Sequence, residues 1–445
     1  MQQYKTVYHK FRNNARVWER SGRHILLVGY NEGAIFMKTL WKTAVCTLLA
    51  AAFTVSAAAQ TWLYETEAGE DPQALITAAE AKEWAQTATV PADESGLSVG
   101  GKGSILVEMS TGTVLFEQNA DAPLPIASVT KIMTLLLIME ALDGGRLALS
   151  DTVTCSPEAA QYGGSQIWLE PGETMTVDDL LKAIAVVSAN DACAAIAEHL
   201  DGSAEAFVLR MNERAKELGM THTEFRDCCG LDDTAFSTAR DVSLMATELM
   251  KHKTVTNYTT IWMDTLRGGK SSLVNTNKLV RYYKGATGLK TGTTSTAGYC
   301  LAGTAERDGL RLCAVILGCA STDERFSGVR AMLDYGFARY ALFTPSVNEK
   351  DLVPIAVKHG VAPSVLPSRP ILAPVLCKKG EEKTITCTMT LKSAVTAPVT
   401  VGETVGTVTV KRGDEVVAKT PVKAGETVAK MTLSVALWRL WAAIV

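Results

Sequence analysis

Hydrophobic and polar positions first settle into a regular pattern well inside the chain. Strand-like apolar runs cover 104–109 and 114–117, and the polar turn between them contains Gly112. Two such runs around a glycine-containing turn are typical of a β-hairpin. Strand patterns return at 299–305 and 312–319. We therefore expect one sheet that brings early and late segments of the chain together.

Between these strands the pattern is helical. Apolar residues from about Ser128 to Leu142 recur at helical spacing, and Gly144–Gly145 marks the expected end of that helix. Further helical patterns occupy 177–184, 192–199, 205–218, 239–250 and 326–342. Strands at both ends with helices between them predict an α+β domain, which we place at residues 101–344.

The composition then shifts towards Val and Thr. Residues 346–428 lose the helical period, so we expect a smaller all-β domain with strands at 384–391 and 405–410. The last segment, 431–445, is apolar and contains two tryptophans. It is too short to cross a bilayer, but an amphipathic helix of this kind suits the membrane surface. A helix packed on the β domain is the alternative.

An export signal is expected near the amino end. Lys38 and Lys42 precede an apolar run at 43–55, and small residues up to Ala59 follow. This order is that of a secretory signal peptide, which we place at 37–59. A buried N-terminal helix is the alternative.

A signal peptide begins near the start of a protein, so we expect translation to begin at Met37. Residues 1–36 would then be a mis-assigned extension. Residues 60–100 show no durable strand period and are interpreted as a linker or presequence. The mature protein is expected to be exported, to the outer face of the cytoplasmic membrane or the wall beyond it.

Composition argues against several classes of function. A net charge of −3 gives no broad basic field, so nucleic acid is not expected as a partner. The ten cysteines form no CxxC pair, and the six histidines form no HExxH motif. Neither a metal ion nor another cofactor is therefore expected.

The candidate chemistry starts with Ser128 and Lys131. A separation of three residues places both side chains on one face of the helix that starts there. A serine hydroxyl becomes nucleophilic when a neutral lysine amine removes its proton. At a helix N-terminus, the Ser128 N–H would also face a developing oxyanion. For an isolated pair, an N-capping serine and a solvated lysine would be the better explanation.

Two further motifs follow. Ser188-Ala-Asn190 stands at the end of a helix, where a loop cap is the simpler explanation. Lys290-Thr291-Gly292 lies in a glycine-rich stretch that lacks the spacing of a phosphate-binding loop. Gly292 suits a strand along which a substrate backbone lies closely. A second lysine near the serine is also useful, because a desolvated amine beside another cation loses its proton more readily.

The ordered set S-x-x-K, S-x-N, K-T-G resembles the signature of penicillin-binding proteins and serine β-lactamases. Segments across the α+β domain are similar to the serine D-alanyl-D-alanine carboxypeptidases, the low-molecular-mass penicillin-binding proteins of peptidase family S11; they lie at 125–134, 169–173, 188–192, 211–220, 275–279 and 288–293. The resemblance covers roughly 103–342, and the β domain and terminal helix match the same layout. It implies a β-lactamase/transpeptidase-like fold of antiparallel sheet and helices.

The resemblance also implies a mechanism. Lys131 would take the proton of Ser128, which would attack the carbonyl between the last two D-alanines of a peptidoglycan stem peptide. Ser188 would relay a proton to the departing D-alanine, and Asn190 would brace Lys131. Water would then release the acyl-enzyme.

The remaining residues would bind the substrate. Backbone N–H groups of the nucleophile and of Thr293 would hold the oxyanion, and Lys290 would supply positive potential. Thr291 and Arg325 would bind the terminal carboxylate. Arg325 is placed only by its spacing before 335–337, so a surface arginine is the alternative. β-Lactams would acylate the same serine as covalent inhibitors.

Other functions stay open on this fold. A class A β-lactamase places a deacylating glutamate after the second motif. Glu170 and Glu173 precede that motif, and no such loop signature lies between Ser188 and Lys290. A catalytically idle wall scaffold and a transpeptidase are the other candidates.

The stretch 227–237 departs from the family pattern. It lacks an Asn and a His that relatives often show, which puts the local loop structure in doubt more than the catalysis. Export would permit Cys228 and Cys229 to form disulfides, but the connectivity cannot be read from the sequence.

Overall fold

The computed structural model describes residues 96–444. The predicted extension at 1–36 and signal peptide at 37–59 lie outside the described residues, as does most of the 60–100 linker. Within the described range, no helix combines the length and apolar character that a membrane span requires.

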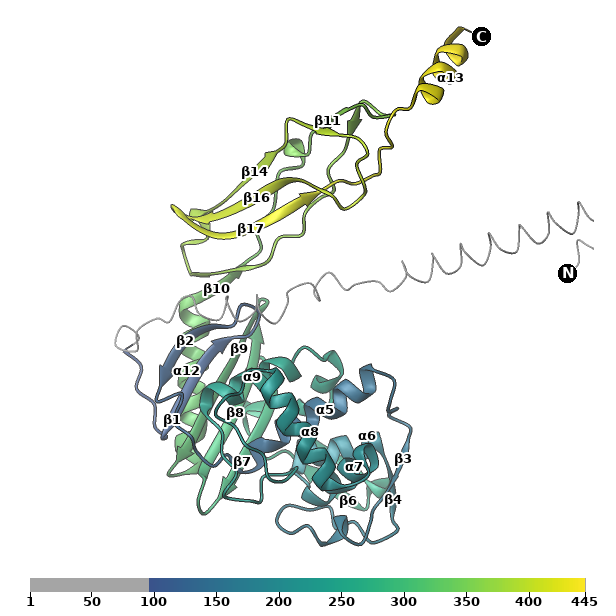
Figure 1. Ribbon diagram of the computed structural model, residues 1–445. Helices are drawn as coiled ribbons and strands as arrows, with labels where there is room; N and C mark the ends of the chain where they lie inside the picture. Colours follow the sequence, from purple (N-terminus) through teal and green to yellow (C-terminus); the bar gives the residue numbers. More distant parts are fainter. Residues whose placement is uncertain (1–95, 445) are drawn as a thin grey trace, which may run out of the picture. The chain divides into compact units, whose positions relative to one another are not determined.

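A five-stranded antiparallel sheet forms the centre of the α+β domain (Figure 1). Its strands, in spatial order, are β2 (Thr113–Gln118), β1 (Gly103–Glu108), β9 (Leu310–Cys319), β8 (Gly298–Arg307) and β7 (Ala286–Thr294). The β1–β2 hairpin and the pairing of β1 with β9 confirm that early and late segments share one sheet.

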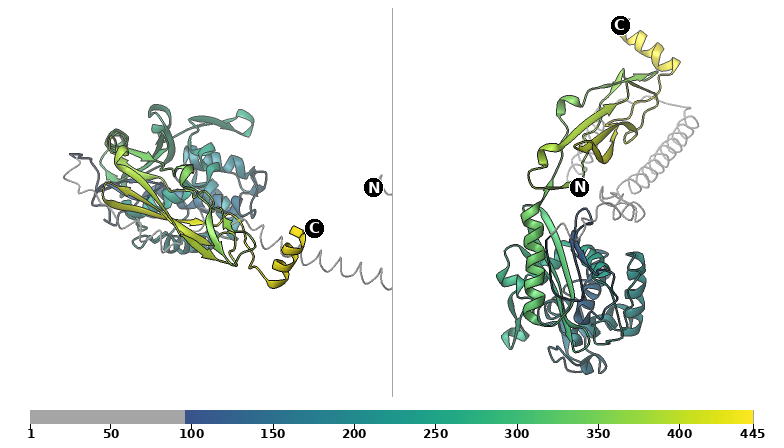
Figure 2. Two further views of the ribbon diagram at one scale, coloured as in Figure 1. Left: turned by 90° about the horizontal axis from the view of Figure 1, so that it is seen from above. Right: turned by 90° about the vertical axis from the view of Figure 1, so that its left-hand side faces the viewer.

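Side chains alternate across this sheet and separate two cores. The helical layer covers one face of the sheet and α12 covers the other (Figures 1 and 2). Ile105 and Val315 pack into the core under the helical layer, whereas their neighbours Leu106 and Ile316 pack beneath α12. The helices are α5 (Lys131–Asp143), α6 (Val177–Lys182), α7 (Asn190–Asp201), α8 (Ala204–Glu217), α9 (Ala239–Leu249), α10 (Thr256–Thr259), α11 (Leu279–Tyr282) and α12 (Thr322–Arg339). Two short antiparallel strand pairs accompany them: β3 (Thr152–Thr154) with β4 (Thr174–Thr176), and β5 (Met263–Leu266) with β6 (Ser271–Val274).

The largest differences between predicted and observed helix boundaries are at α5 and α12. A 3₁₀ turn, Ala127–Thr130, precedes α5, which begins at Lys131 instead of Ser128. Helix α12 begins earlier than expected because the Ser321 hydroxyl accepts the Glu324 N–H at 3.1 Å and caps it. It ends at Arg339, since the chain becomes strand β10 (Tyr340–Phe343).

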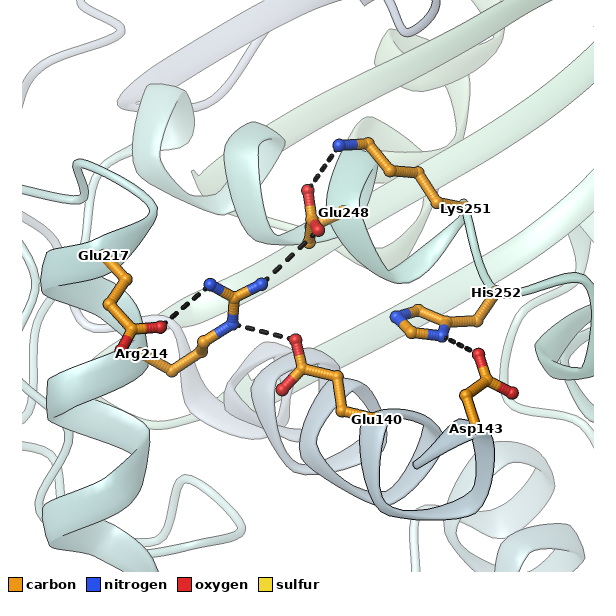
Figure 3. Close-up of polar contacts among 7 residues, drawn as sticks. All are labelled: Glu140, Asp143, Arg214, Glu217, Glu248, Lys251 and His252. Carbon is orange, nitrogen blue, oxygen red and sulfur yellow. Dashed lines mark hydrogen bonds and ion pairs between the residues drawn. The ribbon is translucent and has the colours of Figure 1, made fainter. Parts of the chain in front are cut away.

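Ion pairs tie the far end of α5 to neighbouring helices (Figure 3). Arg214 on α8 meets Glu140 on α5 at 2.8 Å and Glu248 on α9 at 3.4 Å. His252 contacts Asp143 at the last residue of α5. These contacts hold the C-terminal end of the helix whose first residue is Lys131.

Apart from two 3₁₀ turns, Glu349–Asp351 and Glu382–Thr384, the C-terminal region is all β up to its last helix. Its strands are β11 (Ile355–Lys358), β12 (Ser364–Val365), β13 (Val375–Lys378), β14 (Ile385–Leu391), β15 (Ala394–Thr396), β16 (Thr404–Arg412) and β17 (Glu415–Lys423). Buried valines build its own core. A two-residue turn, Gly413–Asp414, connects β16 and β17. The helix α13 (Leu433–Ile444) follows.

All nine cysteines of the described range are free thiols, and eight of them are buried. Cys228 and Cys229 are fully buried side by side, so the disulfides considered for them are not formed.

Candidate active site

Ser128 and Lys131 lie together where the 3₁₀ turn passes into α5. Ser128 is partly exposed, whereas the Lys131 side chain is completely buried. The Lys131 Nζ lies 3.0 Å from the Ser128 Oγ. The predicted spacing therefore brings the hydroxyl and the amine into direct contact.

Two other acceptors fix the Lys131 amine. Its Nζ lies 2.6 Å from the Asn190 Oδ1 and 2.7 Å from the carbonyl oxygen of Cys229. An uncharged amine has two N–H donors and one lone pair. In that form, its two N–H groups would serve these two acceptors and its lone pair would face the Ser128 hydroxyl. Asn190 thus occupies its predicted place; the Cys229 carbonyl is a backbone group that no side-chain pattern signals.

Ser188 and Asn190 follow a single π-helical turn, Ala183–Val187. Ser188 adopts the left-handed conformation with φ 65°, which is rare for residues other than glycine. Its hydroxyl is buried and has no hydrogen-bond partner among the described residues. The Asn190 side chain donates to the Gly163 carbonyl at 2.7 Å, which fixes the amide and leaves Oδ1 for Lys131.

Lys290 on β7 is also buried, with its Nζ donating to the Thr291 carbonyl at 3.0 Å. Burial lowers the pKa of Lys290 well below its usual value, and the neighbouring charges of Lys131 and Arg325 lower it further. The Thr291 hydroxyl meets the Thr276 hydroxyl at 2.7 Å.

Gly292 allows β7 to lie directly against the nucleophile turn. A Cβ at this position would come within 2.6 Å of the Ile126 carbonyl oxygen and 3.1 Å of the Ser128 nitrogen. The contact that requires glycine is thus with the chain's own backbone, not the substrate backbone expected from the sequence. The absence of a side chain sets the distance between β7 and Ser128.

Arg325 is buried, so the alternative of a surface arginine is wrong. Its guanidinium donates to the Gly292 carbonyl at 3.1 Å and to the Thr293 hydroxyl at 2.9 Å. It also lies over the rings of Tyr299 and Phe326. Burial lowers the pKa of Arg325. No carboxylate of the described residues forms an ion pair with it, and its Nε lacks a partner there.

The two glutamates before the second motif, Glu170 and Glu173, have different surroundings. Arg267 holds Glu173 through two contacts, at 2.7 and 3.0 Å, and keeps the pKa of that carboxyl below its usual value. Glu170 is exposed to solvent.

Two family models match parts of this chain. The family model described as D-alanyl-D-alanine carboxypeptidase matches residues 86–321. The chain belongs to this family. A second model, the C-terminal domain of penicillin-binding protein 5, matches residues 358–430.

Relatives resemble the chain over most of its length. D-alanyl-D-alanine carboxypeptidase DacF of Bacillus subtilis is 42% identical over 336 residues, 74% of this chain and 86% of the relative. DacC of Escherichia coli is 34% identical over 74% of this chain and 85% of its own. Penicillin-binding protein 5 of Haemophilus influenzae is a structural neighbour, with a TM-score of 0.66 and 26% identity over 77% of this chain and 100% of that one. The protein is therefore a serine D-alanyl-D-alanine carboxypeptidase with a penicillin-binding protein fold.

Proposed function

We propose that Ser128 is the acylated nucleophile of this carboxypeptidase and that Lys131 is its base. The observation that carries the proposal is the position of the Lys131 amine. Asn190 and the Cys229 carbonyl hold it, and its Nζ lies 3.0 Å from the Ser128 Oγ. General-base catalysis requires this kind of direct contact between the base and the hydroxyl.

In the acylation step, the proton of Ser128 passes to Lys131 as Oγ attacks the carbonyl between the last two D-alanines. The Ser128 and Thr293 N–H groups hold the oxyanion. The tetrahedral intermediate then collapses: the C–N bond breaks, and the leaving amine receives a proton by way of the Ser188 hydroxyl. That hydroxyl is suited to a relay, since no described residue engages it. In deacylation water attacks the ester, and the proton returns to Ser128.

The terminal carboxylate of the substrate is bound by Lys290, Thr291 and Arg325. Both cations are buried without a carboxylate partner among the described residues, and burial disfavours the charge on each. A bound carboxylate would compensate that cost, because an opposite charge favours the charged form. The site would thus select peptides with a free C-terminus.

Release of D-alanine from diacetyl-Lys-D-Ala-D-Ala tests the proposal. We expect release by the wild type, and a loss of about 10⁴-fold or more in Ser128→Ala and Lys131→Met, as for other acyl transferases that lose the nucleophile or base. Ser110→Ala, an exposed serine in the β1–β2 turn, is the matched control and should retain full activity. Absence of release by the wild type, with retained murein binding, would support the idle scaffold instead.

Penicillin distinguishes this enzyme from a β-lactamase. We propose that penicillin forms a long-lived ester on Ser128, because the Arg267 ion pair engages Glu173 and leaves it unsuited to deacylation. Intact-mass measurement should show one stable adduct in the wild type. Rapid penicillin turnover without an adduct would favour the lactamase.

The proposed location is the outer face of the cytoplasmic membrane. Along α13 the exposed side chains include Leu437, Trp438, Leu440 and Trp441, which suit the interface between lipid and water. Deletion of 431–445 should release the protein from membrane fractions without a loss of D-alanine release. Unchanged membrane association would contradict this role of the helix.

A further inference from the structure

The loop that carries the Cys229 carbonyl is organised around Asp227. The Asp227 Oδ1 accepts the N–H of Cys229 at 2.7 Å and also that of Gly230. Its Oδ2 accepts the N–H of Leu231 at 2.8 Å and that of Asp232 at 2.6 Å. Four consecutive backbone donors therefore converge on one carboxylate.

This arrangement uses both oxygens of the carboxylate. An ionised carboxylate is acceptor-only at both oxygens, whereas an asparagine has one acceptor oxygen and one NH₂ group. In Asp227→Asn, the amide could satisfy one pair of N–H groups, but its NH₂ would face the other pair. In this loop, which departs from the family pattern, the Asp227 carboxylate thus matches all four donors.

A single peptide unit links Asp227 to the catalytic lysine. In the peptide unit between Cys229 and Gly230, the Gly230 N–H donates to the Asp227 Oδ1. The Cys229 carbonyl oxygen of the same unit accepts from the Lys131 Nζ at 2.7 Å. Because a peptide unit is planar and rigid, fixing the N–H also fixes the direction of the carbonyl. Hydrogen bonds to a charged group are stronger than neutral ones, so the carboxylate is an effective anchor.

The same peptide lies directly against the nucleophile turn. Gly230 has φ +80°, and a Cβ there would come within 2.0 Å of the Ala127 carbonyl oxygen. The Thr134 hydroxyl on α5 also donates to the Cys228 carbonyl at 2.5 Å. The loop therefore packs closely against the Ser128 turn and α5. A rotation of the Cys229–Gly230 peptide would displace the carbonyl that accepts from the Lys131 amine.

We propose that Asp227 is a positioning residue for the general base. It touches neither the hydroxyl nor the amine; it holds the Cys229 carbonyl in place, and this carbonyl, with Asn190, aims the Lys131 lone pair at Ser128. The inference rests on the proposed function of Ser128 and Lys131, and it adds a residue outside the three motifs to the acylation step.

Acylation by a fluorescent penicillin, followed at increasing concentrations, tests this role. In Asp227→Ala we expect the limiting acylation rate constant to fall about 10²-fold, the usual effect of misplacing a catalytic group by about 1 Å. The half-saturating concentration should stay within about twofold, because the binding groups on β7 are untouched. The final labelling should still reach one penicillin per chain. Asp227→Asn, which retains one acceptor oxygen, should lie between Asp227→Ala and the wild type.

Asp232→Asn is the matched control. It removes the same charge from the same loop, but the Asp232 carboxylate accepts hydrogen bonds only from Thr234 among the described residues. This variant should be acylated at the wild-type rate. An equal slowing in Asp232→Asn, or an unchanged rate constant in both Asp227 variants, would overturn the proposal. A purely structural role would lower the labelled fraction and leave the rate constant of the labelled molecules unchanged. Failure of the proposed function itself would appear separately, as a wild type that is not acylated.

Discussion

At the scale of single residues, Lys290 carries an energetic cost. Burial beside Lys131 and Arg325 lowers its pKa well below the usual 10.5, so the folded protein binds this proton more weakly than the unfolded chain does. Between the lowered pKa and 10.5 the unfolded state holds more protons, and stability therefore rises with pH across that window. Below this pH window, the buried charge of Lys290 lowers the free energy of unfolding by its full amount.

We predict that Lys290→Met abolishes D-alanine release without lowering stability at neutral pH. The substitution removes the buried charge, so the variant should unfold at the same or a higher temperature than the wild type. The difference in melting temperature between the variant and the wild type should shrink as the pH approaches 10.5. Calorimetric melting across this range checks the prediction, and a variant that is less stable at neutral pH and more stable at high pH would contradict it.

Gly292 is the second test at this scale. In Gly292→Ala the new methyl group would push β7 away from the Ile126 carbonyl and the Ser128 nitrogen. We predict a loss of acylation of about 10²-fold, because the oxyanion N–H of Ser128 would shift relative to β7. The rate of acylation by penicillin measures it, with circular dichroism to show that the fold persists. A wild-type rate would show that the close approach is unimportant.

At the scale of elements, α5 is held at both ends. Lys131 stands at its start, and the Arg214 ion pairs join its last turn to α8 and α9 (Figure 3). We predict that Arg214→Met lowers the free energy of unfolding by about 1 kcal/mol, the upper range for partly exposed ion pairs. Acylation at temperatures well below melting should be unchanged. Urea denaturation and penicillin labelling measure the two quantities; a large kinetic effect would mean that these pairs also set the catalytic geometry.

Elements with a clear period were predictable, and those set by tertiary contacts were not. The β1–β2 hairpin and α5 to α9 follow from alternation, helical spacing and a glycine turn. The π-helical turn before Ser188 has no sequence period that would predict it. The β5–β6 hairpin was not predicted because exposed residues on both strands interrupt the apolar alternation. The three motifs predicted the contacts of Lys131 with Ser128 and Asn190, whereas Arg325 was placed only by its spacing before 335–337. The sequence did not predict the contacts of the Cys229 carbonyl or of the Asp227 carboxylate, because these contacts involve backbone groups.

At the scale of the whole molecule, all nine described thiols are unpaired and eight of them are buried. Burial raises the pKa of the Cys300 thiol to about 11 and that of Cys313 to about 12, so little reactive thiolate forms at neutral pH. We predict that iodoacetamide leaves the activity of the native enzyme unchanged. After unfolding, all nine of these cysteines should be alkylated. A shift in electrophoretic mobility on reduction would instead reveal disulfides.

We propose that segments distant in sequence converge so that the Lys131 amine deprotonates the Ser128 hydroxyl. The most direct test is a proteolytic digest of penicillin-labelled protein, with mass spectrometry to locate the modified residue. The account predicts a penicilloyl group on Ser128 in the wild type and almost none in Lys131→Met over the same labelling time. An adduct on another residue, or undiminished labelling of Lys131→Met, would contradict it.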